Sequence, residues 1–230
     1  TVENAFETSF RERTRHSFKR THEALRQRQH DRVQQMRQTC SLVMQIPGLR
    51  ALIAESGDEL RAEHANSLRQ RLDYLSGAIH ADFMYALNAR GRLIAGGGQL
   101  PAAKLRRFEN HLHRNALARS MLTRVLRPSS ESKAAHQAGL AGLWAYEGAL
   151  YQMVAMPMVF QGRSATEPPR AAGAILVGAK LTDQLATELG RNQNCEVTFL
   201  TNEQVAASSL GNASSVLADH RIAGDRETSG

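Results

Sequence analysis

The sequence has few of the residues that cross-link, interrupt or bind metals. Its 230 residues include two cysteines, six prolines and one tryptophan, and aromatic residues make up only 5%. Cys40 and Cys195 are far apart, and neither lies in a CxxC or Cys/His spacing, which argues against a zinc site. The sequence leaves open whether these two thiols form one disulfide or stay free.

Long apolar runs are also missing. The longest, residues 149–160, contains Gln and Tyr and falls short of the roughly 18 residues that a membrane-spanning helix needs. No signal peptide is recognisable. Because the chain begins with Thr1 rather than Met, we expect it to be a piece of a longer protein whose other parts hold the membrane segments.

Signatures of catalysis and of metal or cofactor binding are missing as well. No HExxH spacing occurs, and His111 and His113, two residues apart on a predicted helix, are interpreted as surface or capping residues. The glycines at 96–98 lack the GxxxxGK[ST] frame of a phosphate loop, and no serine lies in a GxSxG elbow. We therefore expect no catalytic, metal or cofactor residues and no enzyme activity in this fragment, although a missing output domain can be an enzyme.

Positive charge is what the sequence has in excess. Lys plus Arg is 29 and Asp plus Glu is 22, which gives +7, and residues 1–50 carry ten basic and five acidic residues. An Arg-rich helix can neutralise phosphates, but acidic residues are interspersed and no base-reading aromatic pattern accompanies them. A solvated helix face without nucleic acid is the first interpretation. The alternative is a cytoplasmic regulatory protein that binds nucleic acid or an acidic partner through this helix.

Three helical stretches precede or interrupt the strands. Residues 1–45 contain no Gly or Pro, and their apolar residues recur at intervals close to multiples of 3.6 residues. This pattern predicts a helix roughly 60 Å long. We expect the helix to project from the domain or to pair with a second copy. A second helix is expected over 49–79, with an interruption at 56–58, and a third over 101–126.

The remaining pattern predicts an antiparallel sheet. Residues 82–98 are typical of a strand, a turn at 88–91 and a return strand. A three-stranded meander is expected over 143–146, 150–160 and 172–179. A helix that Thr182 caps is expected over 182–190, and a last strand pair over 196–200 and 205–209. The predicted class is α+β, with a long N-terminal helix followed by an antiparallel sheet.

Four stretches resemble parts of a known family. Residues 83–95 resemble a first hairpin, and residues 147–157 resemble a central strand. Residues 172–181 resemble a last core strand, and residues 196–209 resemble the start of a second module. Together the order resembles the extracytoplasmic Cache (double Cache) sensor domains of bacterial membrane signalling receptors, whose core is a PAS-like five-stranded sheet. The likeness covers roughly residues 10–210. The amino-acid-binding signature of some double Cache domains is not recognisable, so amino acids are not implied as ligands.

The resemblance implies an organisation and a function. It implies a helical stalk and second helix over 1–79, a PAS-like Cache module over 80–190, and an incomplete membrane-proximal module over 191–230. The expected protein is the periplasmic part of an inner-membrane receptor with a histidine kinase, diguanylate or adenylate cyclase, or chemoreceptor output. Its partner would be a small molecule or a periplasmic protein, and its N-terminal helix would form a homodimer.

The resemblance also places a ligand pocket between the sheet and the segment before the meander. The candidate ligand-binding residues there are Tyr85, Trp144, Tyr146 and Tyr151. Alternation puts Trp144 and Tyr146 on one face of their strand, and Trp and Tyr offer apolar walls with polar tips. The other interpretation, that these are ordinary core or surface aromatics, stays open at this point.

Overall fold

The computed structural model divides the chain into two compact units. One contains residues 1–34 and 182–230, and the other contains residues 35–181. The residues described are 2–55, 62–99, 104–127, 139–160, 170–193, 195–201 and 204–211. The interruption expected at 56–58 and the tail after residue 211 lie outside them. The three predicted module boundaries stay predictions.

Helices dominate the first 80 residues, as predicted. They are α1 (Val2–Met44), α2 (Pro47–Glu55) and α3 (Ala62–Ala78). Pro47 suits the first position of α2 because its missing N–H would have no partner there. Leu49 and Ile53 are fully buried on α2, and Leu68 and Leu72 are fully buried on α3. The helical region expected over 49–79 is therefore confirmed where the structure describes it, as two helices.

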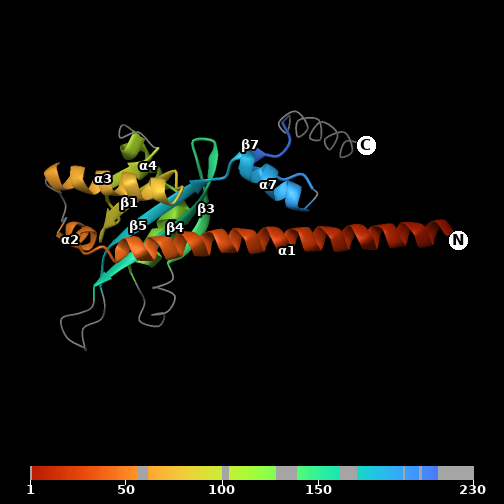
Figure 1. The fold of residues 1–230 in the computed structure, drawn as a ribbon, viewed down its shortest axis with the longest axis horizontal. Helices are drawn as coiled ribbons and strands as arrows, with labels where there is room; N and C mark the ends of the chain where they lie inside the picture. The colour runs from red at the N-terminus through yellow and green to blue at the C-terminus, as the bar shows by residue number, and fades with distance from the viewer. Residues whose placement is uncertain are drawn as a thin grey trace. The chain divides into compact units, whose positions relative to one another are not determined.

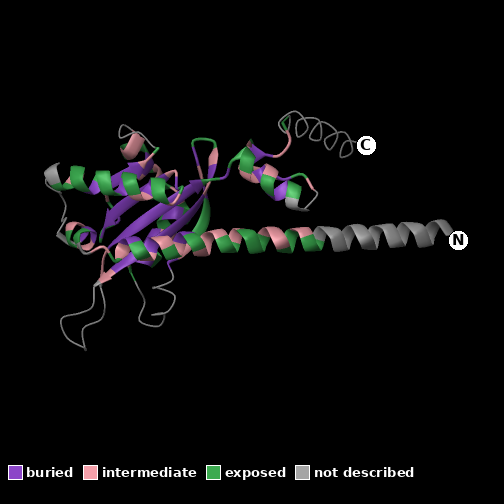
Figure 2. Cartoon of the chain, viewed as in Figure 1, coloured by how far each residue is buried: buried purple, intermediate pink, exposed green. Residues whose placement is uncertain are grey.

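The sheet has five antiparallel strands, which confirms the predicted fold class. They are β1 (Phe83–Asn88), β2 (Leu93–Gly98), β3 (Leu140–Tyr146), β4 (Ala149–Phe160) and β5 (Arg170–Lys180). Their order is β2-β1-β5-β4-β3, so the first hairpin pairs with the last strand of the meander (Figure 1). This arrangement puts β5 at the centre between β1 and β4, and Figure 2 shows β1 and β5 buried.

The β1–β2 turn and the β3–β4 turn both contain residues with positive φ angles. The Asn88 Oδ1 accepts hydrogen bonds from the backbone N–H of Arg90 (2.9 Å) and Arg92 (3.0 Å), while Gly91 has φ of 77°. Glu147 and Gly148 turn β3 into β4 with φ of 46° and 74°. The turn predicted at 88–91 is confirmed.

The helix expected over 101–126 is instead two helices. They are α4 (Leu105–Arg114) and α5 (Ala116–Leu126). Asn115 adopts an extended conformation between them, and its side chain accepts hydrogen bonds from the N–H of Leu117 and Ala118, both at 3.1 Å. Such capping satisfies the first free N–H groups of α5. On α5, Ala118, Leu122 and Val125 are buried, whereas Leu117 is 76% exposed.

Helices cover the two faces of the sheet with different side chains. Against α4 and α5 lies the aromatic face, formed by Phe83, Tyr85, Trp144, Tyr146, Tyr151, Met153 and Leu176. By alternation, the opposite, aliphatic face is formed by Met84, Ala86, Val154, Met156, Ile175 and Val177. A Cβ on Gly97 of β2 would lie 2.4 Å from the backbone carbonyl carbon of Leu72, which places α3 directly against the aliphatic face.

The last turns of α1 also contribute buried side chains to this unit. Met36, Cys40 and Val43 are buried, and the Arg37 guanidinium donates to the carbonyl of Gly139 (3.2 Å). Both cysteines are free, which settles the alternative left open above. Burial raises the pKa of the Cys40 thiol to about 12.

The other unit contains a short helix and a two-stranded sheet. They are α7 (Asp183–Gln193), β6 (Thr198–Thr201) and β7 (Gln204–Ser208). As predicted, Thr182 caps α7, accepting from the N–H of Leu185 at 3.2 Å. A small apolar cluster joins α7, the start of β6 and α1; it comprises Leu25, Leu185, Ala186, Leu189, Val197 and Phe199.

Candidate ligand-binding site on the aromatic face

The structure brings the four predicted ligand-binding residues onto one face of the sheet. Tyr85 is 1% exposed, Trp144 and Tyr146 are each 4% exposed, and Tyr151 is half-buried. Trp144 lies opposite Tyr151 in the β3–β4 ladder, and Tyr85 lies on β1 at the centre of the sheet. The alternation rule therefore predicted correctly that Trp144 and Tyr146 share a face.

Two glycines make room for the rings on this face. A Cβ on Gly178 of β5 would lie 2.1 Å from the ring of Phe83, and one on Gly96 of β2 would lie 2.3 Å from the ring of Tyr85. The two rings stack with centroids 5.0 Å apart. A larger residue at either position would displace an aromatic ring, so these glycines shape the site. The sequence analysis did not identify them, because their ring contacts are cross-strand.

Helix α4 supplies two further rings that sequence reasoning missed. The Phe108 ring meets Tyr85 at 4.5 Å and Trp144 at 4.8 Å, both edge-to-face. His111 lies 5.2 Å from the rings of both Trp144 and Tyr146, and its Nε2 donates to the carbonyl of Ala145 at 3.1 Å. The interpretation of His111 as a surface residue is therefore wrong. Its spacing of three from Phe108 places both on one side of a helix, which was the available signal.

Two polar atoms of this cluster are buried without a hydrogen-bond partner among the described residues. They are the hydroxyl oxygen of Tyr85 and the indole Nε1 of Trp144. Burial raises the pKa of Tyr85, and burial followed by the charge of Glu147 and a side-chain hydrogen bond with it raises that of Tyr146, so both phenols stay protonated at neutral pH. A buried polar group without a partner costs about 1 to 3 kcal/mol. The cluster thus contains donors that a polar ligand can satisfy.

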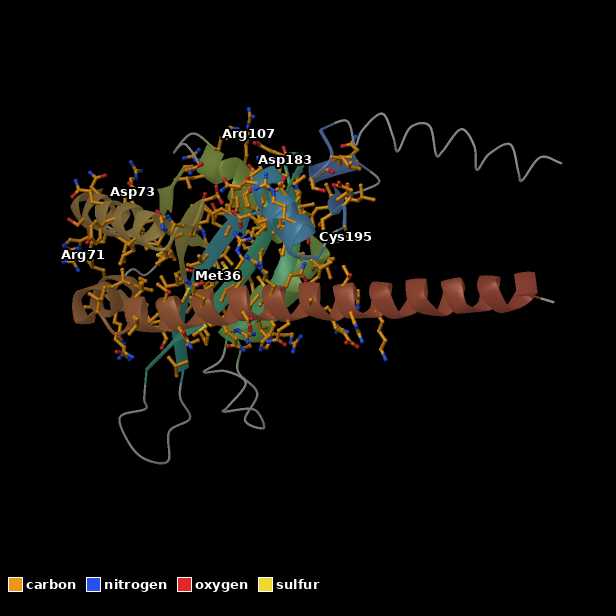
Figure 3. All side chains as sticks on the ribbon, turned by 45° about the vertical axis from the view of Figure 1, so that its right-hand side comes forward. Met36, Arg71, Asp73, Arg107, Asp183 and Cys195 are labelled. Atoms are coloured by element: carbon orange, nitrogen blue, oxygen red, sulfur yellow. The ribbon has the colours of Figure 1, made fainter. Side chains whose placement is uncertain are left out.

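A salt bridge ties the segment before α4 to the β3–β4 turn. The Lys104 ammonium lies 2.9 Å from the Glu147 carboxylate, and this hydrogen bond holds the pKa of Glu147 below its usual range. Arg107, which Figure 3 shows on α4, lowers it further. The pair lies next to Tyr146, so it fixes the end of the aromatic cluster that faces solvent.

The helices over the aromatic face are strongly basic. Residues 104–127 contain seven Lys or Arg and one Glu, so this segment carries +6 of the chain's +7. Its six arginines are exposed. Residues 1–50, to which the excess charge was assigned above, carry +5; the fold places the +6 of residues 104–127 over the aromatic face, where it favours anions.

Two cavities flank this cover. One, of about 270 Å³, lies between α5 and β3 and includes Trp144 in its wall. The other, of about 280 Å³, lies between α3, β2 and α4, next to Arg69, Arg106 and Glu109. Glu109 is committed to the fold, because its carboxylate accepts a hydrogen bond from the N–H of Leu93 at 3.1 Å.

The described residues contain neither a cluster suited to a metal ion nor a helix suited to span a membrane. No group of three His, Cys, Asp or Glu side chains in the described part is arranged to hold a metal ion. Nor does any helix within those residues combine the length and apolarity that crossing a bilayer requires.

Comparisons with known proteins give a limited likeness. No family model and no curated protein matches the chain. Among solved structures, the chain is similar to the sensor domain of the V. cholerae histidine kinase DctB, with 14% identity and a TM-score of 0.47. The match covers 85% of this chain and 65% of that one, so the chain spans less than two thirds of the sensor domain's length.

Proposed function

We propose that this chain is the ligand-sensing part of a bacterial transmembrane signalling receptor, located in the periplasm and acting without catalysis of its own. The supporting observation is the aromatic face, where the polar atoms of Tyr85 and Trp144 are buried and have no partner among the described residues. Ordinary cores satisfy such atoms. A ligand that bonds to them would offset their desolvation cost.

The proposed mechanism is a shift between two conformations. A ligand that binds one conformation better draws the population toward it. The aromatic face is joined to the other side of the sheet through β1 and β5, and Arg37 links α1 to the residue that precedes β3. Movement of β3 would therefore reach α1, which the proposal treats as the output helix leading toward the membrane and an output domain.

The first test is a thermal-shift screen of the chain against organic acids, sugars, amines and neutral metabolites. The proposal expects at least one compound to raise the melting temperature of the wild type, with a smaller rise in Tyr85→Phe. Tyr74→Phe is the matched control, since Tyr74 is 78% exposed. A panel without any stabilising compound would count against a small-molecule sensor.

Membrane anchoring is tested by the parent reading frame. The proposal expects an apolar segment of about 20 residues on each side of this chain. A signalling domain beyond the second segment would identify the output. Polar flanks would remove the receptor and leave the regulator with an Arg-rich helix as the better hypothesis.

Dimerisation through α1 is part of the same proposal. Leu42 is 64% exposed on this helix, which suits a contact with a second copy. In analytical ultracentrifugation, Leu42→Glu should weaken the dimer, while Gln45→Glu, at an exposed neighbour just beyond the helix, should not. A monomeric wild-type chain would contradict this part of the proposal.

A further inference from the structure

The two edges of the five-stranded sheet differ in what covers their free backbone groups. The edge strands are β2 and β3. On β2, the Asp73 carboxylate accepts a hydrogen bond from the N–H of Gly98 at 2.7 Å, and the Glu109 carboxylate accepts one from the N–H of Leu93 at 3.1 Å. On β3 the sequence is uncharged and contains no proline, so it lacks the residues that block strand addition at natural sheet edges.

The alternation of backbone groups along β4 shows which groups of β3 point outward. The N–H of Leu181 donates to the carbonyl of Leu150 at 2.8 Å, so Leu150 directs its backbone groups toward β5 rather than β3. Leu150 pairs with Ala145 in the β3–β4 register, and directly opposed residues of an antiparallel pair either both bond to each other or both point away. Ala145, and by alternation Leu143 and Ala141, therefore direct their N–H and C=O groups away from the sheet.

His111 occupies one end of this edge and leaves the rest open. Its Nε2 donates to the outward carbonyl of Ala145 at 3.1 Å. Within the described part of the chain, no group forms a hydrogen bond with the outward N–H and C=O of Ala141 and Leu143, and both residues are exposed. Leu143 is also an apolar side chain that is 48% exposed. Free backbone groups beside an exposed apolar side chain are what a strand added from another chain recognises.

The charge around the open edge indicates what kind of strand it accepts. Arg124 lies in the wall of the cavity between α5 and β3, together with Ala141, Gly142 and Leu143, and the described wall contains no Asp or Glu. The segment 104–127, which includes α5, carries +6. A second copy of the chain would bring the same positive charge to the pairing, which like-charge repulsion disfavours. An acidic strand would be attracted.

We propose that β3 accepts an extended acidic segment of a partner protein as a further strand along residues 141–143. Side chains of the added strand alternate between the two faces of the sheet. Apolar side chains would lie beside Leu143, and acidic side chains on the other face would reach Arg124. The main chain supplies hydrogen bonds, and the alternating side chains supply specificity. This surface adds a protein partner to the proposed sensor and needs no ligand on the aromatic face.

The first experiment measures binding of an acidic strand-forming peptide. The probe is an acetylated and amidated hexapeptide of alternating Val and Glu, labelled with a dye for fluorescence anisotropy, and the control replaces each Glu by Lys. We expect saturable binding of the acidic peptide, weakened by added salt, and at least about tenfold weaker binding of the basic one. Absence of binding by the acidic peptide, or equal affinity for both peptides, would overturn the proposal.

Amide hydrogen exchange, followed by nuclear magnetic resonance, shows whether the bound peptide pairs with the edge. Saturating peptide should slow exchange at Ala141 and Leu143 about tenfold or more. Gly142 is the internal control, because its N–H already points toward β4 and should change less. Unchanged exchange at Ala141 and Leu143 with peptide bound would overturn the edge site. Protection that grows with protein concentration without peptide would identify a second copy as the occupant and overturn the acidic partner.

Two pairs of variants locate the contact. Ala141→Pro removes an outward N–H and spares the β3–β4 hydrogen bonds, so it should weaken the acidic peptide about tenfold or more. Ala145→Pro, at the end that His111 occupies, should leave the affinity unchanged. Arg124→Gln should weaken binding about fivefold, and Arg119→Gln, exposed on the same helix but outside the cavity wall, should not.

The outcomes separate this surface from the proposed function. Equal affinities of Ala141→Pro and Ala145→Pro, with both variants folded by circular dichroism, would overturn the edge site. A stabilising compound from the thermal-shift screen that depends on Tyr85 would leave the sensor function standing in that case. A screen without such a compound would count against the small-molecule sensor and leave peptide binding at β3 to be decided by its own measurements.

Discussion

The two faces of the sheet differ in how closely their side chains pack and in how many buried polar atoms lack a hydrogen-bond partner. The aliphatic face contains mainly Val, Ile, Met and Ala together with the buried Gln152, and it meets α3 so closely that Gly97 leaves no room for a side chain. The aromatic face contains two buried polar atoms without partners among the described residues, on Tyr85 and Trp144, and borders an open cavity beneath basic helices. One face contributes stability by close packing, while the other keeps features that cost stability. Such a cost is typical of a binding site.

The largest expected effect is the loss of the Phe108 ring. Phe108 is fully buried and contacts four aromatic rings, so Phe108→Ala should lower the free energy of unfolding by about 3 to 5 kcal/mol. Trp144 emission should also change. Leu72→Ala on α3 should cost about 2 to 5 kcal/mol in urea denaturation and leave that emission unaltered. If Leu72→Ala altered it equally, the two faces would not be independent.

A pair of glycines compares the packing directly. In Gly97→Ala the new methyl group would lie 2.3 Å from the backbone nitrogen of Asp73, and we expect a loss of about 1 to 3 kcal/mol from overpacking. In Gly142→Ala it meets nothing within 4 Å, and we expect a change within about 0.5 kcal/mol. Chemical denaturation of both variants checks this. Equal losses would contradict the described contact between α3 and β2.

Removing the Tyr85 hydroxyl should stabilise the free protein. The oxygen is buried without a partner, so Tyr85→Phe removes a desolvation cost and should raise the free energy of unfolding by about 1 kcal/mol. Tyr74→Phe, at a 78% exposed position, should change little. A destabilised Tyr85→Phe would show that the hydroxyl has a partner in solution and would weaken the case for a ligand.

The smallest effect belongs to the Lys104–Glu147 pair at the rim of the aromatic face. Lys104 lowers the pKa of Glu147 below its usual value of 4.5, so the pair stabilises the fold above that pH and its contribution is lost as pH falls through the lowered pKa. The melting temperature of Glu147→Gln should lie slightly below that of wild type at neutral pH and converge with it in acid. Lys104→Gln should give the same profile; a gap that widens in acid would contradict the sign.

Local patterns were sufficient for much of the fold. The absence of Gly and Pro in residues 1–45, the Asn88–Gly91 turn and the Thr182 cap each act over a few residues, and each feature is present as predicted. The alternation of Trp144 and Tyr146 is equally local. The cap at Asn115 was visible in the sequence too, but the apolar repeat continued across it and favoured a single helix.

The sequence by itself determined the helices, the hairpins and which side chains share a face of a strand, because these depend on neighbouring residues. Only the tertiary structure decided that β1 pairs with β5, that Gly96 and Gly178 accommodate the rings of Tyr85 and Phe83, and that His111 lies beside Trp144. These contacts join residues far apart in the chain. Side-chain periodicity specifies a face but not the strand or helix that will cover it.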